Sequence, residues 1–163
     1  MPIVAGDLKM YLTGGAANAD PNASLGGATS SVQFTDNTIR NLFADISPGE
    51  AAAGSVKYRA LAFKNSSAFI AYAAALFISL ETVSAQTTMA VAYDATGTQS
   101  VANEDTAPSG LSFSTPLSLA AAIALGDVAA GAERRVWFRR TVNAGAAQAA
   151  DSGKWTITVG NAP

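Results

Sequence analysis

Alternation of side chains with a period of two is the feature that most restricts how this chain can fold. It is clearest at residues 154–159, where Trp155, Ile157 and Val159 alternate with a lysine and two threonines. Successive side chains of a strand point to opposite faces, so the pattern predicts a strand with one buried face. The stretch is also rich in the aromatic and β-branched residues that strands favour.

The same signal recurs along the chain. Strands are predicted at residues 4–12, 56–64, 88–93, 111–114 and 134–142. Turn-forming sequences lie between these runs, for example D-A-T-G and D-S-G. Short strands separated by turns are typical of a β-sandwich, so we expect an all-β fold.

Three segments have no clear period. Residues 68–80 fit either a strand or an amphipathic helix, because four large side chains lie near one helical stripe. The strands around this segment favour a strand. Residues 117–125 have the same ambiguity, and residues 41–53 are expected to form a loop with about one helical turn.

The apolar run at residues 67–80 also raises the question of a membrane span. It contains 14 residues and is bounded by Lys64 and Glu81, whereas a helical span needs about 20 residues. We therefore expect this run to be buried core, with no membrane partner. The N-terminal sequence M-P-I-V-A-G-D-L-K has no basic start followed by an apolar core, so no secretory signal is expected.

Length and composition narrow the function. A chain of 163 residues predicts one domain over residues 1–163. Histidine and cysteine are absent, which removes the commonest general base, nucleophile and metal ligands, so we expect no enzyme, no cofactor and no metal. The acidic residues Asp94, Glu104 and Asp105 match no calcium loop and are expected to be solvated turn carboxylates.

The charge is low. Charged residues make up 13% of the chain and the net charge is −2, so no nucleic-acid partner is expected. Such a surface repels its neighbours weakly and favours packing against other subunits, including copies of itself.

Residues 13–31 differ from the rest of the chain. They are rich in glycine and asparagine, and Leu25 is their single large apolar side chain. A loop this long is usually functional or disordered. Two alternatives follow: a mobile surface loop, or an arm that becomes ordered against a neighbouring subunit. The candidate contacts of such an arm are Asn18, Asp20, Asn22 and Leu25.

The run E-R-R-V-W-F-R-R concentrates four arginines and two aromatic residues. On a strand, Val136 and Phe138 would face the core, and Arg135, Trp137 and Arg139 would face outward. Arginine beside tryptophan forms cation–π contacts, and both residue types are common at interface hot spots. The outward face could therefore be a self-contained stack in water or a subunit interface, and a nucleic-acid site is less favoured.

Residues 7–28, D-L-K-M-Y-L-T-G-G-A-A-N-A-D-P-N-A-S-L-G-G-A, resemble the N-terminus of a family of small virion structural proteins from tailed bacteriophages. Residues 101–113 and 125–146 resemble the same family and also have the turn–strand–turn rhythm of immunoglobulin-like modules. The resemblance implies an immunoglobulin-like antiparallel sandwich and a non-enzymatic particle component present in many copies.

The expected function is therefore decoration or reinforcement of a phage capsid. The expected partners are the major capsid protein and copies of this chain, and the expected location is the virion, assembled in the host cytoplasm. One alternative is a neck, tail or baseplate component. Another is a carbohydrate- or surface-binding sandwich in which Trp137 stacks on the ligand.

Overall fold

The computed structural model describes residues 3–36, 38, 40–84 and 86–160, so the ends of the predicted domain lie outside the described residues. The described chain forms eight strands, one short α-helix and three 3₁₀ turns. The elements in chain order are η1 (Ala5–Asp7), β1 (Leu8–Thr13), η2 (Pro21–Ala23), β2 (Thr29–Gln33), α1 (Pro48–Ala53), β3 (Ser55–Asn65), β4 (Ala71–Glu81), β5 (Thr87–Asp94), η3 (Leu119–Ala121), β6 (Ile123–Val128), β7 (Glu133–Val142) and β8 (Gly153–Gly160).

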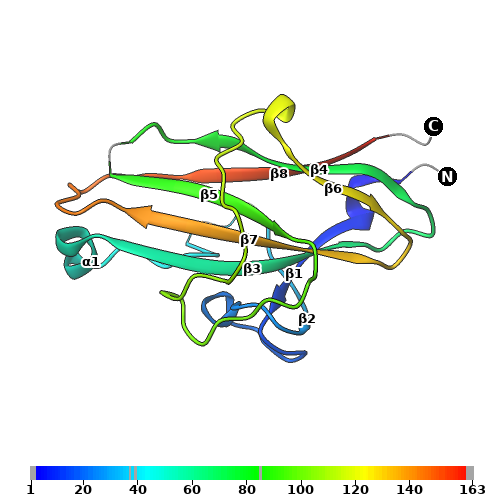
Figure 1. Cartoon of the computed structure of the whole chain (residues 1–163), viewed down its shortest axis with the longest axis horizontal. Helices are drawn as coiled ribbons and strands as arrows, with labels where there is room; N and C mark the ends of the chain where they lie inside the picture. The colour runs from blue at the N-terminus through cyan, green and yellow to red at the C-terminus, as the bar shows by residue number, and fades with distance from the viewer. Residues whose placement is uncertain (1–2, 37, 39, 85, 161–163) are drawn as a thin grey trace.

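The strands form two antiparallel sheets packed as a sandwich (Figure 1). The first sheet has the order β2-β1-β3-β7-β5, and the second has the order β6-β4-β8. The long pairing of β3 with β7 runs from Ser55 opposite Val142 to Lys64 opposite Glu133 and forms the centre of the first sheet. The predicted antiparallel β-sandwich architecture is confirmed, in a mostly β chain with one short helix.

The main core lies between the sheets. Leu61 and Phe63 of β3 contribute to it from the first sheet, and Leu76 and Ile78 of β4 contribute from the second. The three large side chains of β8 pack against the same cluster, as their alternation predicts. The ring of Trp155 lies 4.4 Å from that of Phe138 between centroids, which joins β8 to β7.

Several local predictions are confirmed. Residues 71–81 form strand β4 rather than a helix, with Ala74, Leu76 and Ile78 buried at every second position. The helical turn expected within residues 41–53 is α1. It begins with a capping box in which the Ser47 hydroxyl accepts from the Glu50 backbone N–H and the Glu50 carboxylate accepts from the Ser47 N–H.

Two strand predictions need correction. Residues 111–114 form no strand, and their backbone pairs with β5 only through a bridge between Val91 and Ser114. Leu111 and Phe113 both pack on the outer face of the first sheet. Their spacing of two residues therefore reflects this common packing surface and not a hydrogen-bonded strand ladder. The first strand begins at Leu8, because η1 precedes it and leaves Val4 59% exposed.

No helix in the described part of the chain is both long enough and apolar enough to cross a membrane.

Candidate interaction surface

The arginine-rich strand is β7, and its two faces separate as its alternation predicts. Val136 and Phe138 belong to the main core, whereas Trp137 lies on the opposite, outer face of the first sheet. However, Trp137 is 0% exposed. The prediction that Trp137 faces outward to meet water or another subunit is therefore wrong, because loops of the same chain cover the outer face. The indole lies in a small second cluster with Ala60, Ala92, Tyr58, Val101, Leu111 and Phe113.

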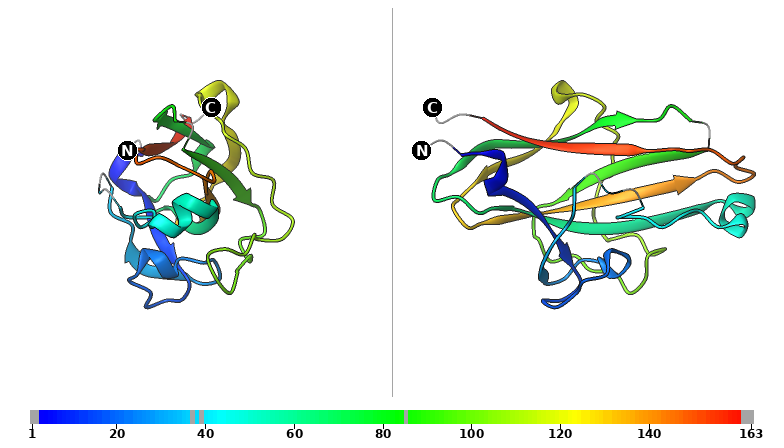
Figure 2. Two further views of the ribbon diagram at one scale, coloured as in Figure 1. Left: turned by 90° about the vertical axis from the view of Figure 1, so that its left-hand side faces the viewer. Right: turned by 180° about the vertical axis from the view of Figure 1, so that it is seen from behind.

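Two loops provide this cover, and we call residues 14–28 together with residues 99–113 the outer loop layer. They lie side by side below β3 in Figure 1 and in both views of Figure 2. They are joined by backbone hydrogen bonds from Gly27 to the Gln99 carbonyl (3.0 Å) and from Val101 to the Leu25 carbonyl (3.0 Å). The first loop is thus ordered against its own chain, which neither of the two sequence-based alternatives described.

Gly26 lies where the first loop of the layer passes close to Trp137. Its φ is +88°, and a Cβ atom placed there would lie 2.7 Å from Cζ2 of Trp137. A side chain at this position would therefore meet both an unfavourable backbone conformation and a clash. The glycine lets the loop pass directly over the indole.

Two buried hydroxyl groups fasten the layer to the sheet. The Ser24 hydroxyl accepts a hydrogen bond from the Thr13 backbone N–H (2.8 Å) and donates to the Ala60 carbonyl (2.6 Å). The Thr13 hydroxyl also donates to Ala60 (2.9 Å) and accepts from the Gly26 N–H (3.0 Å). Both side chains are 0% exposed, so these bonds form in a place that water does not reach.

The two arginines that flank Trp137 also bind within the chain. Arg135 donates to the Gly27 carbonyl (2.7 Å) and to the Thr29 hydroxyl (3.0 Å), and burial lowers the pKa of its guanidinium. Arg139 lies over the ring of Phe113, 5.2 Å from the centroid, rather than over Trp137. The predicted arginine–aromatic contact thus exists, but with an aromatic ring supplied by the loop layer.

Three of the four candidate contacts in the first loop have structural roles. The Asn18 amide donates to the Thr13 carbonyl (2.6 Å), and the Asp20 carboxylate accepts from the Asn22 N–H (2.9 Å) to cap η2. The Asn22 side-chain oxygen accepts from Arg59 (3.2 Å). Leu25 differs, because it is only partly buried and borders an open hollow.

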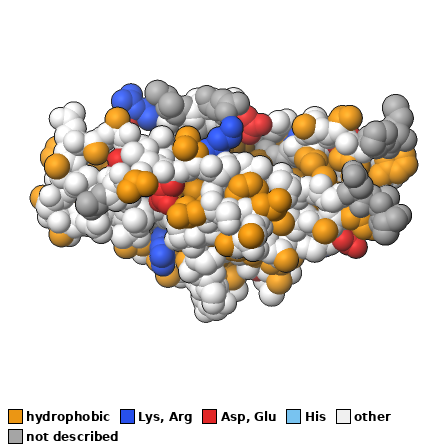
Figure 3. All heavy atoms as spheres, turned by 90° about the horizontal axis from the view of Figure 1, so that it is seen from above, with side chains coloured by type: hydrophobic (Ala, Val, Ile, Leu, Met, Phe, Trp, Pro, Cys, Tyr) orange, Lys and Arg blue, Asp and Glu red, His pale blue; other side chains and the backbone are white. Residues whose placement is uncertain are grey.

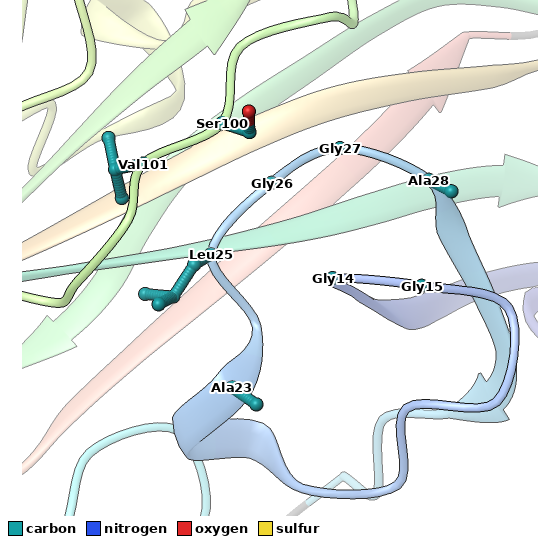
Figure 4. A pocket seen from close by; sticks show the side chains of 9 residues that line it. All are labelled: Gly14, Gly15, Ala23, Leu25, Gly26, Gly27, Ala28, Ser100 and Val101. Carbon is teal, nitrogen blue, oxygen red and sulfur yellow. The ribbon is translucent and has the colours of Figure 1, made fainter.

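This hollow lies between the two loops and has a volume of about 410 Å³ (Figure 4). It is lined by Gly14, Gly15, Ala23, Leu25, Gly26, Gly27, Ala28, Ser100 and Val101. None of these lining residues is charged, and Leu25 and Val101 provide the largest apolar side chains. The hollow has room for a small or apolar side chain and offers backbone polar groups around it.

Asp94 organises the second loop and corrects one prediction. Its carboxylate is buried rather than solvated, and it accepts hydrogen bonds from the backbone N–H groups of Thr96, Gly97 and Gln99, each 3.0 Å long. Burial alone would raise the pKa of Asp94, but these hydrogen bonds and one from the Thr96 hydroxyl outweigh it and lower the pKa. The turn therefore holds Gln99 in place to meet Gly27.

An ion-pair network missed by the sequence analysis lies at the α1 end of β3. Lys57 contacts Glu50 of α1 (2.7 Å) and Glu104 of the loop layer (2.6 Å), and Arg59 also pairs with Glu104. The hydrogen bond to Lys57 is the main reason that the pKa of Glu50 falls to about 2. Arg59 and Arg140 also lie over the ring of Phe43, at 5.5 and 5.1 Å.

Among the described residues, no group of three or more acidic side chains is placed to hold a metal ion. Comparisons with protein-family models, with curated proteins and with solved structures found no match to this chain.

Proposed function

We propose that the protein is a non-enzymatic, immunoglobulin-like component of a tailed-phage virion that decorates and stabilises the capsid shell. The main support is that the three segments that resemble phage virion proteins lie together in the fold. Residues 7–28 and 101–113 supply β1 and most of the outer loop layer, and residues 125–146 include β7, which this layer covers. The resemblance therefore falls on one continuous part of the molecule.

The outer loop layer is the proposed attachment surface. It is held rigidly by Thr13, Ser24 and Arg135, so binding would cost little ordering of the loops. Its hollow is uncharged and is bordered by Leu25 and Val101. The proposed occupant is a small or apolar side chain of the major capsid protein. Each contact would be weak, and the repetition of the shell would multiply it.

The low charge of the remaining surface favours packing against neighbouring subunits. Charged residues are 13% of the chain, and the face seen from above shows few of them (Figure 3). In this proposal the protein folds in the host cytoplasm and its site of action is the assembled virion.

The attachment surface can be tested with Ala28→Arg. Ala28 is exposed on the rim of the hollow, so a long charged side chain there would block entry and leave the fold intact. Ala120→Arg is the matched control, because Ala120 is exposed on η3, outside the loop layer. Each variant is produced together with the wild-type chain during infection, and mass spectrometry of purified particles gives the ratio of the two.

We expect Ala28→Arg to be depleted from particles and Ala120→Arg to match the wild type. Equal incorporation of both variants into particles would show that the attachment surface lies outside the outer loop layer. Absence of the wild-type chain from particles would reject the virion role itself.

Copy number separates the shell from the alternative neck, tail or baseplate location, since a shell carries far more copies of its components. The carbohydrate-binding alternative gains no support, because its key residue Trp137 is buried beneath the loop layer.

A further inference from the structure

The edges of the two sheets are covered unequally by the rest of the chain. At the edge of the first sheet formed by β2, Ser31 donates its backbone N–H to the Ala16 carbonyl (3.0 Å). At the opposite edge, Val91 of β5 exchanges two backbone hydrogen bonds with Ser114 (2.8 and 3.0 Å). The loops that follow and precede the strands therefore protect both edges of the first sheet.

An arginine protects one edge of the second sheet. Arg134 extends from β7 and donates from Nε to the Leu125 carbonyl of β6 (3.1 Å) and from its terminal nitrogen to the Asp127 carbonyl. Two acceptors of this edge are thus occupied by a charged side chain, which another strand would have to displace.

Strand β8, at the other edge of the second sheet, is different. It pairs with β4 on one side, and no described residue forms a backbone hydrogen bond with residues 155–159 on the other side. The strand is seen along its whole length in the view from behind (Figure 2, right). Its central residues, W-T-I-T-V, contain no proline and no charge, which are the usual devices that keep a bare edge from pairing.

The side chains of β8 are also incompletely covered. Trp155, Ile157 and Val159 pack against the core but remain partly exposed, unlike Leu76 and Ile78 on the neighbouring strand. A strand added beside β8 would cover their exposed parts and also pair the free backbone groups. Such an edge combines polar and apolar reasons to bind an extended strand.

The sequence of β8 complements itself. In an antiparallel pair, the side chains of directly opposite residues lie on the same face of the sheet. A two-fold axis between two copies of β8 must therefore place one residue directly opposite its own copy in the second chain. An axis at Ile157 places Trp155 opposite Val159 and Thr156 opposite Thr158 of the second copy. Aromatic with β-branched and threonine with threonine are both favoured cross-strand pairs. The two Lys154 side chains would lie at opposite ends and would not repel each other.

We propose that two copies of this chain pair through β8, antiparallel, about a two-fold axis at Ile157. The three-stranded sheets of the two copies then form one continuous sheet of six strands. The covered edges at β2, β5 and β6 leave no second site of this kind in the described chain, so assembly stops at the dimer. This pairing is a property of the isolated protein and does not depend on the proposed virion role.

The test uses charge exchange at the facing threonines. In T156K/T158K every new lysine faces another lysine across the axis, and in T156E/T158E every glutamate faces a glutamate. Both variants lose the same hydrogen bond from Thr156 to the Ser79 hydroxyl (2.8 Å), so they are matched in that respect. The control is A120K/A124K, which adds the same positive charge as T156K/T158K but at exposed positions on η3 and β6.

Analytical ultracentrifugation at tens of micromolar protein measures the mass. We expect the wild type and A120K/A124K at twice the monomer mass and each threonine variant at the monomer mass. An equimolar mixture of the two threonine variants should return to the dimer mass, because opposite charges then face each other.

A monomeric wild type, or a T156K/T158K variant that remains dimeric, would overturn the proposal. So would a mixture that stays monomeric while circular dichroism shows both variants folded. If a variant does not fold, the wild type decides alone: amide hydrogen exchange at residues 155–159 must slow as the protein concentration rises, and exchange independent of concentration rejects the pairing.

Discussion

For Trp137, the sequence correctly predicts the face of the sheet on which the side chain lies but wrongly predicts that this face is exposed. Its alternation with Val136 and Phe138 fixes the face on which it lies, and that part is confirmed. Whether this face meets water depends on Gly26 and Phe113, which are far away in the sequence. Strand periodicity is a local signal and contains no information about such distant cover.

We predict that Trp137→Ala lowers the free energy of unfolding by about 3–5 kcal/mol, as expected when a large aromatic side chain leaves a cavity. Trp137→Phe should cost less, because the buried indole nitrogen has no hydrogen-bond partner among the residues that the structure describes. Urea denaturation measures both values. Leu117→Ala is the control and should change stability by no more than about 0.5 kcal/mol, since Leu117 is 61% exposed. A small effect of Trp137→Ala would mean that the loop layer does not pack tightly on the sheet.

At the scale of elements, helix α1 is tied to the sheet by charge rather than by apolar contact. None of its residues is buried, but Glu50 forms an ion pair with Lys57 of β3. Serine at the N-cap and glutamate three residues later are visible in the sequence and predict the helical turn. The network beyond it could not be predicted, because Glu104 and Arg140 reach it from distant parts of the chain.

The Glu50 carboxylate should make stability depend on pH. Its pKa is about 2 in the folded protein, against an ordinary value of 4.5. A pKa that is lower in the folded state means that the ionised group stabilises the fold. This stabilisation is fully present above about pH 4.5 and is lost as the pH falls toward 2. The pKa of Glu104 is also lowered, so its contribution changes in the same direction.

We therefore predict that Glu50→Gln has a lower Tm than the wild type at pH 7, and that the difference shrinks between pH 4.5 and pH 2. Thermal unfolding followed by circular dichroism measures both trends. Asp36→Asn removes a negative charge from an exposed side chain and serves as the control. A difference between Glu50→Gln and the wild type that is the same at every pH would show that the carboxylate acts only through its size and shape.

The strands themselves were predictable to different degrees. Strands with alternating large side chains and a long ladder to one neighbouring strand, such as β5 with β7 and β8 with β4, match their predicted ranges closely. Residues 111–114 have the same local pattern, but they meet β5 at a single bridge, so a ladder does not form. Partner strands, more than local pattern, decide whether an extended segment becomes a strand.

For the whole molecule, the number of bare sheet edges determines how far assembly could proceed. Arg134 covers β6 by donating to two of its carbonyl groups. We predict that Arg134→Ala exposes a second edge, so that the protein forms species larger than those of the wild type and of increasing size as its concentration rises. Dynamic light scattering follows this growth.

Arg40→Ala is the matched control, because Arg40 pairs with Asp45 at the surface and is 68% exposed. Unchanged particle size for Arg134→Ala would show that the β6 edge is protected by something other than this arginine. A single sandwich was predictable from length and alternation, but edge protection was not, because it depends on which side chain crosses from one sheet to the other.

The outer loop layer also has a consequence for the order of events during synthesis. Residues 14–28 leave the ribosome before β7, and Arg135, which binds the Gly27 carbonyl, follows 108 residues later. At bacterial and eukaryotic elongation rates this delay is roughly 5–20 s. Throughout that time the glycine-rich segment has neither β7 nor Trp137 to cover. Its few apolar side chains are then an advantage, because a nascent segment of this composition offers little for other chains to adhere to while it waits for its sheet.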